Sequence, residues 1–355
     1  MQTAIYSSLK AMHYHDRLDA MQAGDVPAPV HVRIKPTNIC NHNCYFCAYR
    51  TDDVSLGEDM VVRDRIPREK MAEIVDDLLA MGVQAVTFSG GGEPLLYPYF
   101  AETVNRLAEG DIKIASLTNG SRLKGKVADA LAAHGTWVRV SIDGWDGPSY
   151  GEYRSVPETA FEEVMANLTA FAARGSDCVL GGSIIVDQRN ANHIVDLCRR
   201  LKQAGVSHAK ISPCIIANGG AENNLYHDGF KDVVRAQIAE AKSLNDENFQ
   251  VVDHYHSMEI DFSKHYERCA FAQMLTVIGA DCKIYTCQDK AYTESGTLGD
   301  ISGQSFREFW YSEENRRQLA AINPAQNCQH HCVADAKNRL LNDYLSLAPD
   351  HLAFI

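Results

Sequence analysis

Short apolar runs alternate with amphipathic helical patterns along most of the chain. The runs have the length of strands, and the stretches between them place apolar residues three or four positions apart, as one face of a helix requires. Six pairs of run and helix follow one another: Val30–Lys35 with Arg68–Met81, Val83–Ser89 with Tyr99–Ala108, Ile112–Thr118 with Lys124–His134, Trp137–Ile142 with Ala160–Arg174, Val179–Val186 with Ala191–Ala204, and His208–Pro213 with Phe230–Leu244. This order predicts an α/β fold with parallel strands joined by right-handed crossovers, either a doubly wound sheet or a barrel.

The two ends of the chain depart from this alternation. Apolar residues lie near helical spacing from Ile5 to Met21, and Gly24 follows, which predicts one amphipathic helix and a linker. After about residue 250 the alternation stops and cysteines accumulate. We therefore expect three units: an N-terminal helix and linker over residues 1–29, an α/β domain over 30–255 and a smaller domain over 256–355.

Charge and composition exclude several classes of protein. With 34 basic and 46 acidic residues the net charge is −12, which argues against a nucleic-acid partner, because such proteins normally present a basic face. The start lacks the pattern of a signal peptide, and no run of about 18 apolar residues predicts a membrane span. We expect a cytoplasmic protein, in which the eleven cysteines serve metal binding or catalysis more readily than disulfides.

Three cysteines stand close together after the first apolar run. Cys40, Cys44 and Cys47 have the spacing Cys-x3-Cys-x2-Cys, which is one ligand short of the closed tetrahedron of structural zinc. Three thiolates can instead hold a [4Fe-4S] cluster with one iron open to a small molecule. With Phe46 before the last cysteine, the run resembles the cluster loop of the radical S-adenosylmethionine (SAM) superfamily; a zinc knuckle or unrelated thiols are the alternatives.

This resemblance implies a fold and a chemistry. The superfamily shares a partial (β/α)6 TIM-like barrel, in which the cluster loop follows the first strand and reactions occur at the C-terminal strand ends. The open iron would bind the amino and carboxylate groups of SAM, and an electron from a reductant such as flavodoxin or ferredoxin would cleave SAM to a 5′-deoxyadenosyl radical. The protein would hold SAM and the substrate hydrogen in line.

The resemblance also assigns residues that bind SAM. The run Ser89–Pro94 contains a Gly-Gly-Glu motif that would receive the amino group, although a glycine-rich turn is also a common strand ending. The fourth strand ends in Ser-x-Asp and an arginine follows, which match the positions beside SAM and its carboxylate. The alternative is that these polar residues only cap turns. The assigned residues are Phe46, Gly91, Gly92, Glu93, Ser141, Arg154 and, for the ribose, Ser183.

A second set of cysteines lies in the last hundred residues. Four thiolates, from Cys269 and Cys287 around a predicted hairpin and from Cys328 and Cys332, could close a zinc site or bind a second [4Fe-4S] cluster. The layout resembles the twitch domain, a shortened SPASM extension that holds one auxiliary cluster, and therefore favours two [4Fe-4S] clusters in all. Cys282 stands where those families have glycine, and we interpret it as a spare thiol or an alternative ligand.

Two histidines and three single cysteines remain. His330 and His331 are expected to be solvated rather than to bind metal. A small buried hydrophobe is the better interpretation of Cys178 and Cys198. Cys214 follows the sixth predicted strand, where it could donate a hydrogen atom to a substrate radical or could be an inert buried thiol.

The expected function is a radical SAM oxidoreductase with SAM and two [4Fe-4S] clusters as cofactors. The segment before Val30 is too short for the peptide-recognition domain of many SPASM enzymes, which favours a small polar substrate such as a sugar, aminocyclitol or nucleoside. Oxidation of that substrate is the first hypothesis. The alternatives are a radical epimerase or deoxygenase that uses Cys214, a peptide-modifying SPASM enzyme, a nucleic-acid modifier and a zinc-stabilised binding module without activity.

Overall fold

The computed structural model describes residues 6–50, 56–257 and 262–354, which include one ten-stranded sheet. Its order is β10-β9-β8-β1-β2-β3-β4-β5-β6-β7, and all neighbours from β8 to β7 are parallel. Strands β9 and β10 are antiparallel additions. The strands are β1 His31–Ile34, β2 Ala85–Phe88, β3 Lys113–Thr118, β4 Gly135–Ser141, β5 Val179–Val186, β6 His208–Pro213, β7 Gln250–Asp253, β8 Leu275–Ile278, β9 Lys283–Tyr285 and β10 Thr297–Asp300.

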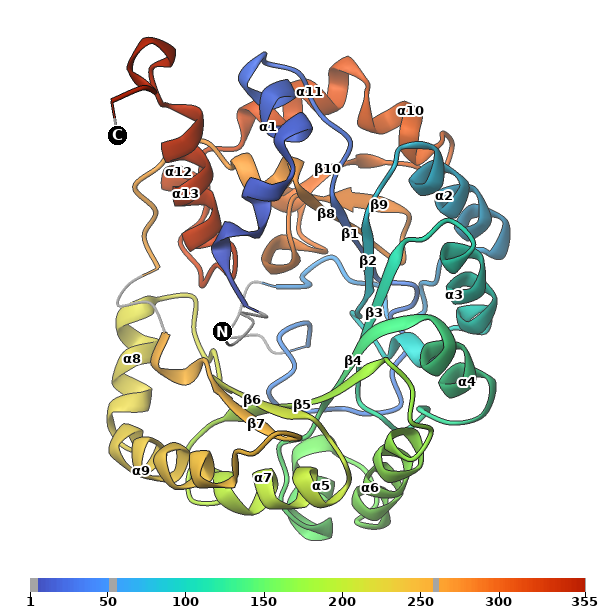
Figure 1. Ribbon diagram of the computed structural model, residues 1–355, viewed down its shortest axis with the longest axis vertical. Helices are drawn as coiled ribbons and strands as arrows, with labels where there is room; N and C mark the ends of the chain where they lie inside the picture. The colour runs from blue at the N-terminus through green and yellow to red at the C-terminus, as the bar shows by residue number, and fades with distance from the viewer. Residues whose placement is uncertain (1–5, 51–55, 258–261, 355) are drawn as a thin grey trace.

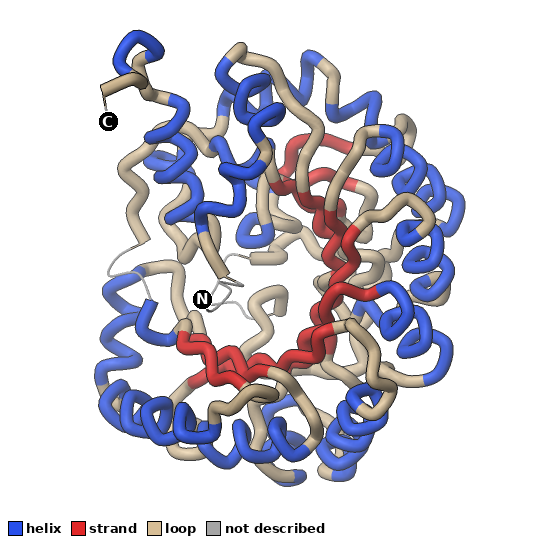
Figure 2. Tube along the Cα trace, in the orientation of Figure 1, coloured by secondary structure: helices blue, strands red, loops and turns tan. Residues whose placement is uncertain are grey.

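The sheet curves into a partial barrel whose helices lie on its outer side (Figures 1 and 2). The α-helices are α1 His15–Gln22, α2 Arg68–Ala80, α3 Phe100–Ala108, α4 Gly125–His134, α5 Gly147–Arg154, α6 Thr159–Ala172, α7 Ile194–Gln203, α8 Gly220–Asp228, α9 Lys231–Ala241, α10 Phe306–Trp310, α11 Glu313–Ala321, α12 Pro324–Asn327 and α13 Asp335–Leu345. The 3-10 helices are η1 Ser8–His13, η2 Pro94–Leu96, η3 Lys242–Leu244, η4 Tyr255–Ser257, η5 Ala270–Gln273, η6 Gln288–Lys290, η7 Glu294–Gly296 and η8 Pro349–His351. One large hydrophobic core fills the space between strands and helices. The prediction of an α/β partial barrel is confirmed.

Two predicted features of the fold are wrong in detail. The single N-terminal helix is two short helices, η1 and α1, because Tyr14 between them has φ −108° and ψ 65°, outside the helical region. Ile5, where that helix was expected to begin, lies outside the described residues. The alternation also extends one strand further than predicted, since β7 pairs in parallel with β6. The polar residues around this four-residue strand concealed it.

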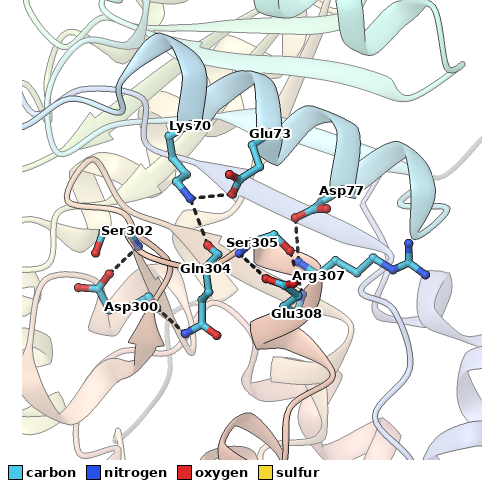
Figure 3. Close-up of polar contacts among 9 residues, drawn as sticks. All are labelled: Lys70, Glu73, Asp77, Asp300, Ser302, Gln304, Ser305, Arg307 and Glu308. Carbon is cyan, nitrogen blue, oxygen red and sulfur yellow. Dashed lines mark hydrogen bonds and ion pairs between the residues drawn. The ribbon is translucent and has the colours of Figure 1, made fainter.

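The cysteine-rich region continues the sheet of the barrel. Strand β8 pairs in parallel with β1, so the hairpin of β8 and β9 extends the sheet beside the strand that leads into the first cysteine loop. The turn after β10 docks on α2 (Figure 3). There Lys70 Nζ donates to the Gln304 carbonyl at 3.1 Å, and the Arg307 amide donates to Asp77 Oδ2 at 2.9 Å. These contacts attach the segment after β10 to α2, the helix that follows the first cysteine loop.

Among the described residues, no helix combines the length and apolarity needed to cross a membrane.

Candidate SAM and iron-sulfur site

The first three cysteines lie on a loop that leaves the C-terminal end of β1. Cys40, Cys44 and Cys47 are partly exposed free thiols, and none is bridged to another cysteine. The Cys47 amide donates to the Cys44 carbonyl at 3.1 Å, a turn that brings these two residues together. Soft sulfur donors on one short loop suit an iron-sulfur cluster, so the donor set fits the group that the sequence predicts.

The glycine run after β2 packs against the backbone at the start of this loop. The Glu93 amide donates to the Ile39 carbonyl at 2.9 Å, directly before Cys40. A Cβ atom at Gly92 would lie 2.2 Å from the Ile39 oxygen, and one at Gly91 would lie 2.5 Å from Asn38 Oδ1. The run therefore needs glycine because the backbone of the cysteine loop packs against it.

The substitution Gly92→Ala tests this packing. The new methyl group meets backbone atoms that cannot rotate away, so we expect unfolding stability to fall by about 1–3 kcal/mol and the loop to hold less iron. Thermal unfolding and iron analysis would measure both effects. Gly303→Ala is the matched control, because a Cβ atom there meets nothing within 4 Å; equal behaviour of the two variants would contradict the packing argument.

Glu93 is held rigidly at the end of β3. Its side chain is 2% exposed and accepts hydrogen bonds from Thr118 Oγ1 at 2.6 Å, the Asn119 amide at 2.7 Å and the Leu95 amide at 3.0 Å. Burial raises the pKa of this carboxyl group, while the bonds from Asn119 and Thr118 act in the opposite direction. Asn119 also donates to Asn41 in the cysteine loop at 3.0 Å. Glu93 is thus oriented beside the loop, and its contact with the SAM amino group stays a prediction.

Arg154 connects the cysteine loop to the barrel. Its guanidinium forms an ion pair with Asp143, and its Nη1 lies 3.4 Å from Cys44 Sγ. The Asn43 amide donates to the Arg154 carbonyl at 2.9 Å, and the Ile185 amide donates to Asp143 Oδ1 at 2.7 Å. Burial lowers the pKa of Arg154, but the negative charge of the neighbouring Asp143 raises it, and the net shift is upward. The arginine therefore stays charged next to a thiol of the loop.

The sequence prediction missed the role of Asp143. It lies two residues after Ser141 in the Ser-x-Asp motif, and its side chain is fully buried. A buried carboxylate needs a charged or hydrogen-bonding partner, and Arg154 is the first arginine after Asp143 along the chain. That pairing was the available signal. The ion pair with Asp143 uses part of the hydrogen-bonding capacity of the Arg154 guanidinium. The predicted contact between Arg154 and the SAM carboxylate stays a prediction.

Three further predicted residues lie around this centre. Ser141, the last residue of β4, is directly opposite Ser183 in the middle of β5. The Phe46 ring lies 5.4 Å from the guanidinium carbon of Arg154 and packs against Tyr153. The strand ends, the glycine run and the cysteine loop thus meet at one end of the barrel, as the superfamily resemblance implies.

A buried network that sequence reasoning did not find joins the two cysteine regions. Lys35, which directly follows β1, is fully buried and donates to the Tyr49 hydroxyl at 2.6 Å. The Gln288 side chain contacts the same hydroxyl and accepts from Arg33 Nη1 at 3.2 Å. Tyr49 belongs to the first loop and Gln288 follows Cys287. Nothing in the sequence links residues 239 positions apart, so only the fold reveals this network.

The second set of four cysteines gathers at the edge of the barrel formed by η5, η6 and the segment after α12. Burial raises the pKa of Cys269 to about 11, and it also raises the pKa of Cys287 and Cys332. The charges of Cys269 and Cys328 act on Cys287, which indicates that these thiols are neighbours. Within the described part of the chain, no three Cys, His, Asp or Glu side chains form a site for a single metal ion.

Cys282 lies away from the other four. It occupies the turn between β8 and β9 with φ +61°, a left-handed conformation that favours glycine. Glycine adopts this conformation without strain, which agrees with the glycine that the twitch-domain resemblance implies at the position. Burial raises the pKa of the thiol to about 11, and its side chain belongs to the main hydrophobic core. The turn thus makes Cys282 a packing residue in this structure.

A cavity of about 350 Å³ lies between the two cysteine sets. Ala48 of the first loop lines one wall, and Asp289, Lys290 and His330 of the second region line another. Ile215, after β6, also contributes. Among the described residues, no cysteine of either set lines the cavity itself, but residues adjacent to both sets do, and they place acidic, basic and imidazole groups on its surface.

Cys214 is buried beside this cavity and does not line it. Its amide donates to the Val186 carbonyl, and its carbonyl lies 2.8 Å from His227 Nε2. Burial raises the pKa of the Cys214 thiol to about 12, so the thiol is uncharged at neutral pH. Cys178 and Cys198 are likewise buried in the core.

The sequence matches the Radical SAM superfamily over residues 34–213, which is half of the chain, and the protein belongs to this superfamily. The matched segment begins in β1 and ends with β6, so it contains the first cysteine loop and all the residues assigned to SAM.

Curated relatives and solved structures agree with this membership. A GTP 3′,8-cyclase of Ectopseudomonas mendocina (strain ymp) is 25% identical over 219 residues, 60% of this chain and 63% of its own. An S-adenosylmethionine-dependent nucleotide dehydratase of Lacinutrix mariniflava is 31% identical over 107 residues, 30% of this chain and 22% of its own. The chain thus matches less than two thirds of the length of these relatives. The structure of SuiB from Streptococcus suis bound to the peptide SuiA has a TM-score of 0.61 at 15% identity, over 94% of this chain and 78% of that one, which shows the shared fold.

Proposed function

We propose that this protein oxidises a small polar molecule by two electrons, with SAM as co-substrate and a second [4Fe-4S] cluster as electron acceptor. The observation that carries the proposal is the cavity between the two cysteine sets. A substrate there would contact Ala48 of the first loop and, near the second set, Asp289, Lys290 and His330. Two curated relatives are named for nucleotide substrates, which favours the nucleoside type among polar molecules.

When bound, SAM and the cluster on the first loop would supply the 5′-deoxyadenosyl radical, and a cluster on the second set would supply an acceptor for one electron. The substrate then loses one hydrogen atom to the radical, followed by one electron and one proton, so that an alcohol becomes a carbonyl. Asp289 lines the cavity and can accept the proton. The Val333 amide donates to its Oδ2 at 3.1 Å, which holds the carboxylate in place. Protein groups thus orient the substrate and receive its proton.

The position of Cys214 supports oxidation over epimerisation. A hydrogen donor must reach the substrate radical, yet this thiol is 5% exposed and belongs to no wall of the cavity. We therefore propose that Cys214 is structural and that no hydrogen atom returns to the substrate.

The reaction can be tested with anaerobically reconstituted enzyme, SAM and a reductant in deuterated water, with nucleosides, sugars and aminocyclitols, each with and without a phosphate or carboxylate group, as candidates. We expect one candidate to stimulate formation of 5′-deoxyadenosine and to yield a product lighter by two hydrogen atoms, without solvent deuterium at the reacting carbon. Deuterium at that carbon would contradict oxidation and would indicate a hydrogen donor. Mass spectrometry distinguishes the two results.

A further inference from the structure

Three long basic side chains face the inside of the barrel from different strands. Arg33 on β1, Arg139 on β4 and Lys210 on β6 alternate with residues that belong to the hydrophobic core on the outer side. The sheet curves around this inner face (Figure 2). All three are partly exposed, although none of them lines the cavity between the cysteine sets. The interior of an acidic protein is thus basic.

The contacts of these side chains are with neutral groups. Arg33 Nη1 donates to Gln288 Oε1 at 3.2 Å, and Arg139 Nη1 donates to the Tyr6 hydroxyl at 3.2 Å. Lys210 Nζ lies 6.0 Å from the centre of the Tyr6 ring. None of these partners carries the negative charge that a basic group deep in a protein needs.

Within the described ranges, no carboxylate forms an ion pair with Arg33, Arg139 or Lys210. The Nε atoms of Arg33 and Arg139 are buried and lack any hydrogen-bond partner. Donors that are buried and unused cost free energy unless a ligand engages them. The interior is therefore built to receive an acceptor that carries negative charge.

The negative groups near the cysteine sets do not neutralise all of these basic side chains. Asp289, Cys47 and Cys287 all act on the charge of Lys35, which follows β1, and Asp289 also acts on Arg33. Lys210 differs, because only burial and other basic side chains act on it, and they lower its pKa to about 8. Lys210 therefore has no negative neighbour among the described residues.

The basic groups lie close to the predicted SAM residues in the sheet. Arg139 precedes Ser141 by two positions on the same face of β4, which places it about 7 Å further into the barrel. Lys210 is directly opposite Ser183 in the register of β5 and β6. A molecule with its reacting carbon under SAM could extend an acidic group to this depth.

We propose that Arg33, Arg139 and Lys210 bind an acidic group of the substrate, a phosphate or a carboxylate, inside the barrel. The inference rests on the proposed function, since it specifies the small polar substrate as an anion. It also predicts that SAM cleavage is stimulated by acidic candidates and not by their uncharged analogues.

Binding of two simple anions tests the assignment. Reconstituted enzyme with saturating SAM and no reductant would be titrated calorimetrically with inorganic pyrophosphate and with glutarate. We expect one or both to bind, and Arg139→Gln and Lys210→Gln to weaken the binding roughly ten- to a hundredfold, because each removes a charge-assisted hydrogen bond. Binding of pyrophosphate alone indicates a phosphate, and binding of glutarate alone a carboxylate.

Lys113→Gln is the matched control, since Lys113 is exposed at the start of β3. It should leave anion binding unchanged. Without an anion, Arg139→Gln should not lower the unfolding temperature, because it relieves repulsion among basic groups; a purely structural arginine would give a lower value. Normal SAM binding without binding of either anion would overturn the inference and leave the proposed function intact. Absence of SAM binding, with anion binding retained, would overturn only the proposed function.

Discussion

Replacing Cys40, Cys44 and Cys47 together with alanine is expected to abolish formation of 5′-deoxyadenosine and to remove about half of the bound iron. The loss follows because these thiols are the soft donors at the strand ends where Glu93 and Arg154 also lie. Product analysis after anaerobic reconstitution, together with iron analysis, measures both effects.

The matched control is the double variant Cys178→Ala and Cys198→Ala, which removes thiols that are buried in the core. It should keep the iron content of the unmodified protein. Full SAM cleavage by the triple variant would show that the first loop does not hold the cluster.

Replacing Cys287 with alanine is expected to stop product formation while 5′-deoxyadenosine still forms. Cys287 is partly buried and follows the hairpin of β8 and β9, whose strand β8 pairs with β1, so its loss disrupts the second site without touching the first loop. Under the proposed function, the substrate radical then has no electron acceptor. Simultaneous measurement of 5′-deoxyadenosine and product separates the two events.

Cys282→Gly is the control for this variant. The left-handed turn accepts glycine readily, so iron content should not change and stability should shift by no more than about 1 kcal/mol. Loss of iron in Cys282→Gly, with iron retained in Cys287→Ala, would reverse the assignment of the two cysteines.

Periodicity was sufficient for most of the barrel because its strands are apolar runs bounded by polar ends. The segment from Val30 to Lys35 was predicted as a strand, and β1 covers His31–Ile34. Periodicity did not reveal elements that are short or interrupted. Strand β7 has only four residues, and the break at Tyr14 depends on a backbone conformation that apolar spacing does not encode.

The candidate site was predictable where residues are adjacent in the chain. Glu93 and its glycines belong to one motif, and the structure gives that motif a packing reason against Ile39. Contacts between distant segments were not predictable. The pairing of Lys35 with Tyr49 and Gln288 forms only when β8 adds to β1 and brings the two cysteine regions together.

The central claim is that both cysteine sets hold a [4Fe-4S] cluster. Iron, sulfide and zinc analysis of the anaerobically reconstituted, unmodified protein tests it most directly. The account predicts about eight iron and eight sulfide per chain and no zinc. A value of about four iron with one zinc would contradict the second cluster and, with it, the proposed path of the second electron.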